Sequence, residues 1–337
     1  MNISYEESLE IRGIAILMML WLHCFCNWSS PEYTYISYIW LGGYPLPYRL
    51  TYIAGVVVPL YCFLSGYGLC KKHPFNISYL KTKIQKLFCQ YWLVLVIFFA
   101  LSLSMDFSYY NLSMSSLLGN FVGYDTSYNR TLWFLLPYIL LFISCPILFR
   151  LLSRKNIMVV CLSIILVLFV LANWVLKLEA QGKFEYSALI ILIANYFKML
   201  FPFSLGFIAA FYPMPNSLKI LIEKRRPLWL FVLGIVLLSK LFIPSYTLNY
   251  FYLIPGILFW HLLDKPLCLK HLLVKFGKKS TYIWFVHGYF TYYIFHPYIF
   301  CLKYPIFIFM GVLLVSYGLS FLFDYIYAKL SSLKLTR

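Results

Sequence analysis

The stretch LEIRGIAILMMLWLHCFCN, residues 9–27, is a nearly continuous apolar run that contains two charged residues, Glu10 and Arg12, and one histidine, His23. A helix that crosses a lipid bilayer needs about 20 mostly apolar residues, which is close to the length of this run. The run follows an acidic N-terminal segment and lacks the basic start and small-residue cleavage site of a signal peptide. We therefore predict that it stays in the protein as a membrane-spanning helix.

Further apolar runs of similar character follow at 51–70, 87–104, 131–149, 157–176, 188–211, 228–243, 246–263, 280–299 and 305–326. The chain is 62% hydrophobic and only 12% charged, whereas soluble proteins carry about 25% charged residues. We predict an all-α, polytopic transmembrane bundle of about ten spans, which forms a single domain over residues 1–337 and leaves no room for a soluble domain. The runs at 228–243 and 246–263 are short and adjoin each other, so a re-entrant hairpin is the alternative there.

The basic residues set the expected orientation. Short cytoplasmic loops carry an excess of Lys and Arg, and most of the 28 basic residues fall in alternate loops on the side of the N-terminus. The exceptions on the other side are Arg49, Arg130, Lys177, Lys183 and Lys303. We predict that both termini are cytoplasmic, which explains the net charge of +17 without nucleic acid as a partner. Lys198 and Lys240 fall within spans, and the sequence assigns them no role.

The nine cysteines lie mostly inside apolar runs, as do Cys89, Cys145 and Cys161. They form no C-x-x-C pair and no His/Cys spacing suited to a metal. We predict that they pack as small apolar side chains. We therefore expect no metal site and no permanently bound cofactor.

Arg12 and His23 are the polar residues of the first span that point to chemistry, because ionisable groups inside a span are costly. They are eleven positions apart, and at about 100° per residue this is within about 20° of three full turns. They therefore share one helix face, about 16 Å apart along the axis. The arrangement suits a ligand with a charged head at the inner surface and a reactive end inside the membrane. Two alternatives stay open: Arg12 extends to the lipid headgroups, or His23 makes one interhelical hydrogen bond.

Four motifs carry a resemblance to a known family. Residues 10–17 followed by His23 read E-I-R-G-I-A-I-L and then a histidine, residues 58–67 read V-P-L-Y-C-F-L-S-G-Y, residues 132–135 read L-W-F-L, and residues 277–287 read G-K-K-S-T-Y-I-W-F-V-H. In order and in character these stretches resemble the motifs of the membrane acyltransferase 3 family, whose members acylate the hydroxyls of surface saccharides or their lipid-linked precursors. Two departures are the pair Tyr61 and Cys62, where the family has two phenylalanines, and lysines after the second span, where the family often has arginines.

The resemblance implies roles for residues at the matching positions. His23 corresponds to the essential histidine, as general base or acyl relay, and Arg12 to its paired arginine. Arg12 and the inner-loop lysines Lys81, Lys83 and Lys86 are expected to hold the phosphates of acetyl-coenzyme A or another acyl-coenzyme A, a co-substrate. The expected substrate pocket contains Ser65, Trp133 and His287. A structural role for His287 and close helix packing for the pair Ser65 and Gly66 are the alternatives.

The sequence therefore predicts a multi-pass enzyme of the bacterial inner membrane, an O-acyltransferase whose partners are the lipid bilayer and a saccharide or lipid-linked saccharide. The alternative is a transporter or flippase of lipid-linked sugars, which predicts internal repeats or broken helices with paired charges. Neither feature stands out in the sequence. The acceptor sugar, the acylated position, the acyl group and the oligomeric state are left open.

Overall fold

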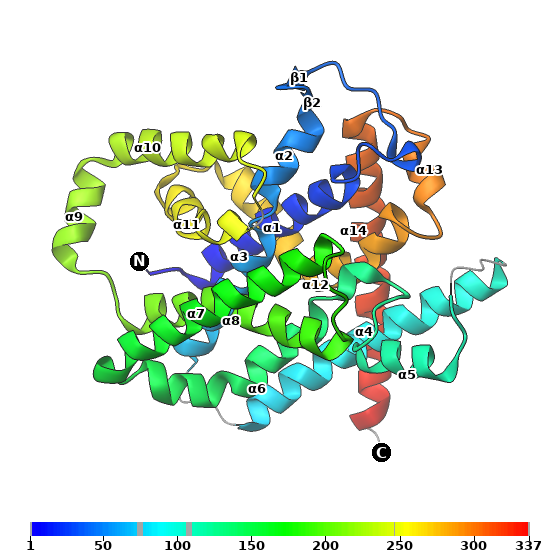
Figure 1. Ribbon diagram of the computed structural model, residues 1–337, viewed down its shortest axis with the longest axis horizontal. Helices are drawn as coiled ribbons and strands as arrows, with labels where there is room; N and C mark the ends of the chain where they lie inside the picture. The colour runs from blue at the N-terminus through cyan, green and yellow to red at the C-terminus, as the bar shows by residue number, and fades with distance from the viewer. Residues whose placement is uncertain (1, 73–76, 106–109, 246, 336–337) are drawn as a thin grey trace.

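The computed structural model describes the chain except for residues 1, 73–76, 106–109, 246 and 336–337. Helices dominate it (Figure 1). The α-helices are α1 (Tyr5–Phe25), α2 (Leu46–Ala54), α3 (Val57–Lys71), α4 (Ile77–Ser104), α5 (Met114–Val122), α6 (Leu135–Leu152), α7 (Lys155–Ala180), α8 (Ala188–Phe211), α9 (Asn216–Lys224), α10 (Arg226–Ser239), α11 (Leu253–Leu262), α12 (Leu267–Thr291), α13 (His296–Phe300) and α14 (Pro305–Leu335). Short 3-10 helices are η1 (Pro31–Tyr33), η2 (Arg130–Leu132), η3 (Lys240–Phe242) and η4 (Thr247–Tyr250), and strands β1 (Trp40–Leu41) and β2 (Tyr44–Pro45) form an antiparallel hairpin.

Helix α1 begins four residues before the apolar run from which it was predicted. The hydroxyl of Ser4 accepts a hydrogen bond from the backbone N–H of Glu7, and Glu6 and Glu7 lie in the first turn. Such a cap and negative charges near the positive end of the helix dipole stabilise a helix start. A polar first turn therefore precedes the apolar part of α1.

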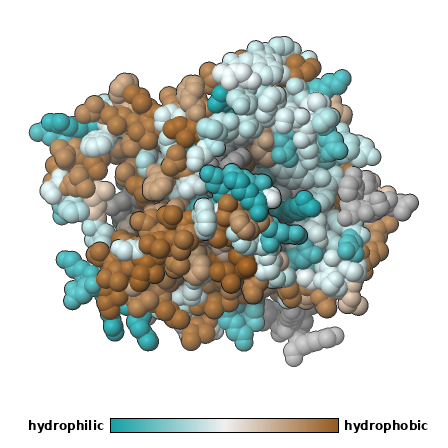
Figure 2. All heavy atoms as spheres, viewed as in Figure 1, coloured by the Kyte–Doolittle hydropathy of each residue, from teal (hydrophilic) through white to brown (hydrophobic). Residues whose placement is uncertain are grey.

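Seven segments are long and apolar enough to cross a membrane within the part of the chain that the structure describes. They are Tyr5–Phe25, Leu46–Lys71, Ile77–Ser104, Arg130–Leu152, Lys155–Ala180, Ala188–Phe211 and Pro305–Ser332. Figure 2 shows apolar residues over much of the left and lower part of one face, where α6, α7 and α10 lie in Figure 1. Large apolar side chains such as Val160, Ile164 and Trp174 are exposed along α7. The all-α, polytopic class predicted from the sequence is confirmed.

The remaining predicted spans have different bounds in the structure. The segment 280–299 was placed wrongly, because the helix there, α12, begins at Leu267 and ends at Thr291. Its first half carries Lys270, Lys275, Lys278 and Lys279, which keeps its mean hydropathy low. Helices α10 and α11 are each shorter than a full span, which favours the hairpin alternative for 228–263. The number of ten spans stays a prediction.

Two helix pairs cross at glycines, and both pairs run parallel. A Cβ added to Gly13 of α1 would overlap the backbone of Leu273 in α12, and one added to Gly277 would overlap the backbone of Leu9. An added Cβ on Gly277 also lies close to the backbone of Gly13, and His23 and His287, each ten residues further on, are again in contact, so the two helices run parallel. Small residues at such crossings let backbones approach closely.

The second parallel pair is α3 and α8. A Cβ on Gly66 would overlap the backbone of Phe203, and one on Gly206 would overlap the backbone of Phe63. Gly66 therefore provides the close packing that was the alternative for the pair Ser65 and Gly66. In the predicted order, α1 and α12 belong to the first and ninth spans, and α3 and α8 to the second and sixth. Spans that are an even number apart cross the membrane in the same direction, so both parallel pairs agree with this order.

Candidate active site

His23 of α1 and His287 of α12 face each other across the first of these crossings. Their ring centroids are 4.9 Å apart, with 44° between the ring planes. Each histidine lies ten residues beyond the crossing glycine of its own helix, Gly13 or Gly277, so parallel helices bring the two rings to one level. His287 is fully buried, whereas His23 is partly exposed. The sequence pointed to both residues but not to their contact.

A chain of hydrogen bonds leads away from His23 through Tyr292 and Cys26 to Asn27. Nδ1 of His23 lies 2.9 Å from the hydroxyl of Tyr292, and this hydroxyl lies 3.2 Å from Sγ of Cys26. The thiol donates to the side-chain oxygen of Asn27 at 3.7 Å, and an amide oxygen only accepts. When the thiol donates to Asn27 it accepts from Tyr292, and the Tyr292 hydroxyl then accepts from Nδ1–H of His23. In this direction neutral His23 carries its one proton on Nδ1, and the lone pair of Nε2 can accept a proton.

His287 is held in the same tautomer by its own helix. Its Nδ1 lies 2.7 Å from the backbone oxygen of Trp284, which can only accept, so Nδ1 carries the proton. Nε2 is buried and has no hydrogen-bond partner among the described residues. A buried acceptor left without a donor costs about 1–3 kcal/mol. The hydroxyl of a ligand would satisfy this nitrogen.

The segment between α1 and α2 covers this end of the helix pair. The ring of Tyr33 packs on Tyr292 and on His296, with centroids 5.9 and 4.6 Å apart. Burial, together with the nearby carboxylate of Glu32, raises the pKa of Tyr33 above its usual value. The phenol at this rim therefore stays neutral at physiological pH.

Arg12 lies among polar groups from three other helices. The hydroxyl of Tyr61 in α3 donates to the backbone oxygen of Arg12 at 3.3 Å and lies beside the guanidinium and the Ser280 hydroxyl. The hydroxyl of Ser65 donates to the backbone oxygen of Tyr61 at 2.8 Å and accepts from Tyr138 of α6 at 2.6 Å. Tyr138 also interacts with the charge of Arg12. No general base contacts Ser65 among the described residues, so its place near Arg12 fits binding and not nucleophilic attack.

Trp133 enters the same region through the 3-10 helix η2. The Asn129 side chain donates to the backbone oxygen of Phe285 at 3.2 Å, and the indole of Trp284 donates to the backbone oxygen of Thr131 at 3.2 Å. These bonds tie the segment before Trp133 to α12 next to His287. The four motifs singled out in the sequence thus meet around the α1–α12 pair.

The inner-loop lysines lie elsewhere. Lys81, Lys83 and Lys86 are exposed on the first turns of α4, where the ammonium groups of Lys83 and Lys86 lie over the rings of Tyr79 and Tyr327. The structure brings none of them into contact with His23, and their role toward phosphate stays a prediction.

Three residues of the site were missed by the reading of the sequence: Cys26, Tyr138 and Tyr292. Cys26 lies three positions after His23, and this helical spacing would have indicated it. Tyr292 directly follows the end of α12, so no helical spacing relates it to His287. Tyr138 is close to Arg12 only because α6 packs near the start of α1.

An integral membrane protein with two histidines in contact and an arginine enclosed by its helices is the class that this fold and site define. No group of three or more His, Cys, Asp or Glu side chains suited to a metal occurs within the described residues. The family model of the acyltransferase domain matches residues 8–325, which include all four motifs. The chain therefore belongs to this acyltransferase family, and the protein is a membrane acyltransferase. No curated protein and no solved structure gives a significant match.

Proposed function

We propose that the protein transfers an acetyl or another short acyl group from acyl-coenzyme A to a hydroxyl of a cell-surface or capsular saccharide, or of its lipid-linked precursor, in the bacterial inner membrane. The observation that carries the proposal is the directed hydrogen-bond chain from His23 through Tyr292 and Cys26 to Asn27. It leaves an unprotonated Nε2 on the helix face that also holds Arg12. Neutral imidazole is the side chain best suited to general-base catalysis near neutral pH.

The reaction then needs one proton to move and one bond to be exchanged. Nε2 of His23 takes the proton of the acceptor hydroxyl as its oxygen attacks the thioester carbonyl. The C–S bond breaks, the ester forms, and the coenzyme A thiolate takes the proton back from the imidazolium. If the acyl group first passes to Nε2, the coenzyme A thiolate leaves in the first step. In the second step the acceptor hydroxyl displaces the imidazole, and its proton passes through the freed Nε2 to the thiolate. Nε2 of His287 accepts a hydrogen bond from a neighbouring hydroxyl of the saccharide.

Arg12 anchors the other end of the donor. The two residues lie about 16 Å apart along α1, and the flexible pantetheine arm of coenzyme A connects its phosphates to the thioester over such a length. Arg12 binds phosphate as a planar, bidentate donor, assisted by Lys81, Lys83 and Lys86 from the start of α4.

The donor site is tested by binding of acetyl-coenzyme A to the purified protein in detergent. Arg12→Ala is expected to weaken saturable binding at least tenfold, since a bidentate charged contact is lost. Arg150→Ala is the matched control, because Arg150 is an exposed arginine at the end of α6, and it is expected to bind like the unmodified protein. Equal weakening in both variants, or no binding by folded protein, contradicts the donor site.

The base is tested separately by acetyl transfer to saccharides in membranes that contain the protein, followed with labelled acetyl-coenzyme A. His23→Gln keeps a side chain able to hydrogen-bond Tyr292 but removes the base. General-base catalysis contributes about 10²–10⁴-fold, so transfer should fall by at least 100-fold while donor binding is kept. Undiminished transfer at equal protein levels rejects His23 as the base.

A further inference from the structure

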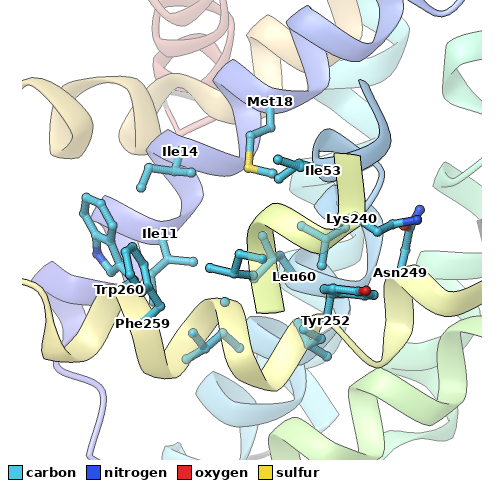
Figure 3. Close-up of a pocket in the computed structure, with 15 residues that line it drawn as sticks. Ile11, Ile14, Met18, Ile53, Leu60, Lys240, Asn249, Tyr252, Phe259 and Trp260 are labelled. Carbon is cyan, nitrogen blue, oxygen red and sulfur yellow. The ribbon is translucent and has the colours of Figure 1, made fainter. Parts of the chain in front are cut away.

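A cavity of about 170 Å³ lies between α1, α2, α3, α10 and α11. Its walls are almost wholly apolar, and Figure 3 shows Ile11, Ile14, Leu60 and Phe259 around it. Engineered apolar cavities of roughly 150 Å³ stay free of water and bind apolar ligands. The chemistry of the walls therefore fits a hydrocarbon chain.

The cavity lies on a different face of α1 from the candidate active site. At about 100° per residue, the lining residues Ile11, Ile14 and Met18 lie about 100–180° around the helix from Arg12 and His23. Neither Arg12 nor His23 lines it. It is a second binding space, and its occupation by a ligand does not depend on the proposed acyl transfer.

Lys240 gives one end of the cavity a positive charge, and its ammonium has few hydrogen-bond partners among the described residues. Lys240 is only 3% exposed, and its ammonium donates to the backbone oxygens of Ile243 and Ser245 at 2.7 and 2.8 Å. An ammonium has three N–H donors, so one is not used in these hydrogen bonds to the described residues, although the ammonium also lies 5.7 Å from the ring centroid of Tyr252. None of the ion pairs between described residues includes Lys240, although buried charges are normally paired.

Two further polar residues lie at or near this end, an amide whose oxygen can accept from a headgroup hydroxyl and a second cation. Asn249, next to Lys240 in Figure 3, is 2% exposed, and its side-chain oxygen has no hydrogen-bond partner among the described residues. Arg49 is 8% exposed, does not line the cavity, and donates to the backbone oxygens of Leu41, Gly42 and Leu241, the neighbour of Lys240, at 2.9, 3.0 and 3.2 Å. Like Lys240, it is in none of the ion pairs of the described residues. An anion is the group that complements the ammonium of Lys240 at the end of an apolar cavity.

We propose that this cavity binds an anionic lipid, with one hydrocarbon chain between α1 and α11 and the phosphate against Lys240. A glycerophospholipid and a polyprenyl phosphate carrier share this chemistry. The head lies at the end of the cavity nearer the C-terminus of α1, and Trp260 lies along the chain at the other end.

Quenching of tryptophan fluorescence tests the proposal in phosphatidylcholine vesicles. The probe is phosphatidylglycerol with brominated acyl chains, and the signal of Trp260 is the part that Trp260→Phe removes. We expect this part to be quenched in a saturable way at a low mole fraction of the probe. Brominated phosphatidylcholine is expected to quench the Trp260 signal only in proportion to its mole fraction, as lipid that surrounds the protein without a specific site does.

Three variants separate the cavity from the surrounding lipid. A Cβ on Gly256 meets only Leu237, at 3.9 Å, so Gly256→Leu extends a side chain into the cavity and should raise the half-saturating mole fraction at least tenfold. Lys240→Gln keeps donors for the two backbone oxygens and should raise it several-fold. Gly318→Leu, at an exposed glycine of α14 with nothing within 4 Å, is the matched control and should leave it unchanged.

The outcomes decide between a site and general lipid contact. Equal quenching in Gly256→Leu and the unmodified protein, or equal quenching by the two brominated lipids, overturns the proposal. If unlabelled polyprenyl phosphate relieves the quenching at lower amounts than unlabelled phosphatidylglycerol, the occupant is a carrier lipid. The reverse order supports the same site with a glycerophospholipid as its occupant.

Discussion

At the scale of single residues, the site depends on which nitrogen of His23 carries the proton. The side-chain oxygen of Asn27 only accepts, so a thiol that donates to Asn27 directs the hydrogen-bond chain away from His23. The proton on Nδ1, which leaves Nε2 of His23 as the base, therefore depends on Asn27, four positions further along the chain. Neither Tyr292 nor Cys26 needs to touch a substrate to act in this way.

Tyr292→Phe tests this positioning role. It removes the acceptor of Nδ1–H, and a hydrogen bond of about 1 kcal/mol corresponds to a rate change of about five- to tenfold. We expect kcat to fall by about this factor with little change in KM for acetyl-coenzyme A, because the donor phosphates are placed at the Arg12 end. A rise in KM with unchanged kcat contradicts the role.

Cys26→Ser and Cys26→Ala form the matched pair for the next link. Serine still accepts from Tyr292 and donates to Asn27, so it should keep most of the activity, whereas alanine breaks the chain and should resemble Tyr292→Phe. The pH profile of kcat gives a second measure, since a chain without direction leaves both tautomers of His23 populated. Equal activity of the two variants argues against a directed chain.

The sequence indicates part of this residue-scale picture. The spacing of Arg12 and His23 and the late motif with His287 identify residues that the structure brings to one helix pair. The contact between His23 and His287 depends on how deeply α1 and α12 interlock, which no spacing within either helix reveals. Tyr292 lies past the end of α12 and is placed by the turn after that helix.

At the scale of helices, the glycines of the motifs have a packing function that the sequence alone gives only in part. Gly13 and Gly277 set the α1–α12 crossing, and Gly66 and Gly206 set the α3–α8 crossing. A side chain at these positions meets a backbone, which cannot rotate away. The motifs therefore combine a residue for chemistry with a glycine that fixes the register of its helix.

Gly277→Ala and Gly68→Ala should have opposite effects on stability. Alanine favours a helix over glycine by about 1 kcal/mol, and Gly68 has nothing within 4 Å of an added Cβ, so Gly68→Ala should stabilise slightly. At Gly277 the added atom overlaps the backbone of Leu9, and overpacking costs about 1–3 kcal/mol. Thermal unfolding in detergent measures both. Equal unfolding temperatures for the two variants would show that the crossing does not depend on Gly277.

At the scale of the whole molecule, the apolar pattern predicts the class well and the span bounds less well. Long runs such as 188–211 coincide with a helix, whereas the lysines in the first half of α12 conceal a helix that packs against α1. Those lysines are tolerated because some have partners outside the helix, as Lys279 has in Asp324 of α14. A pattern of apolar residues cannot indicate a charge that is paired in three dimensions.

Two exposed cysteines, Cys268 and Cys301, test both the orientation and the crossing of α12. Cys268 is the second residue of α12 and Cys301 lies ten residues beyond its end, and the 25 residues of α12 extend about 37 Å, which exceeds the hydrocarbon core of about 30 Å. In the predicted topology Cys268 is cytoplasmic and Cys301 is on the outer side. A membrane-impermeant thiol reagent added to intact cells should therefore label Cys301 and not Cys268, and added to inverted vesicles it should do the opposite. Cys268→Ser and Cys301→Ser assign the two signals. Labelling of both from one side would show that α12 does not cross and would remove one of the ten spans, whereas labelling on opposite sides in the reverse sense would keep the crossing and place the termini outside.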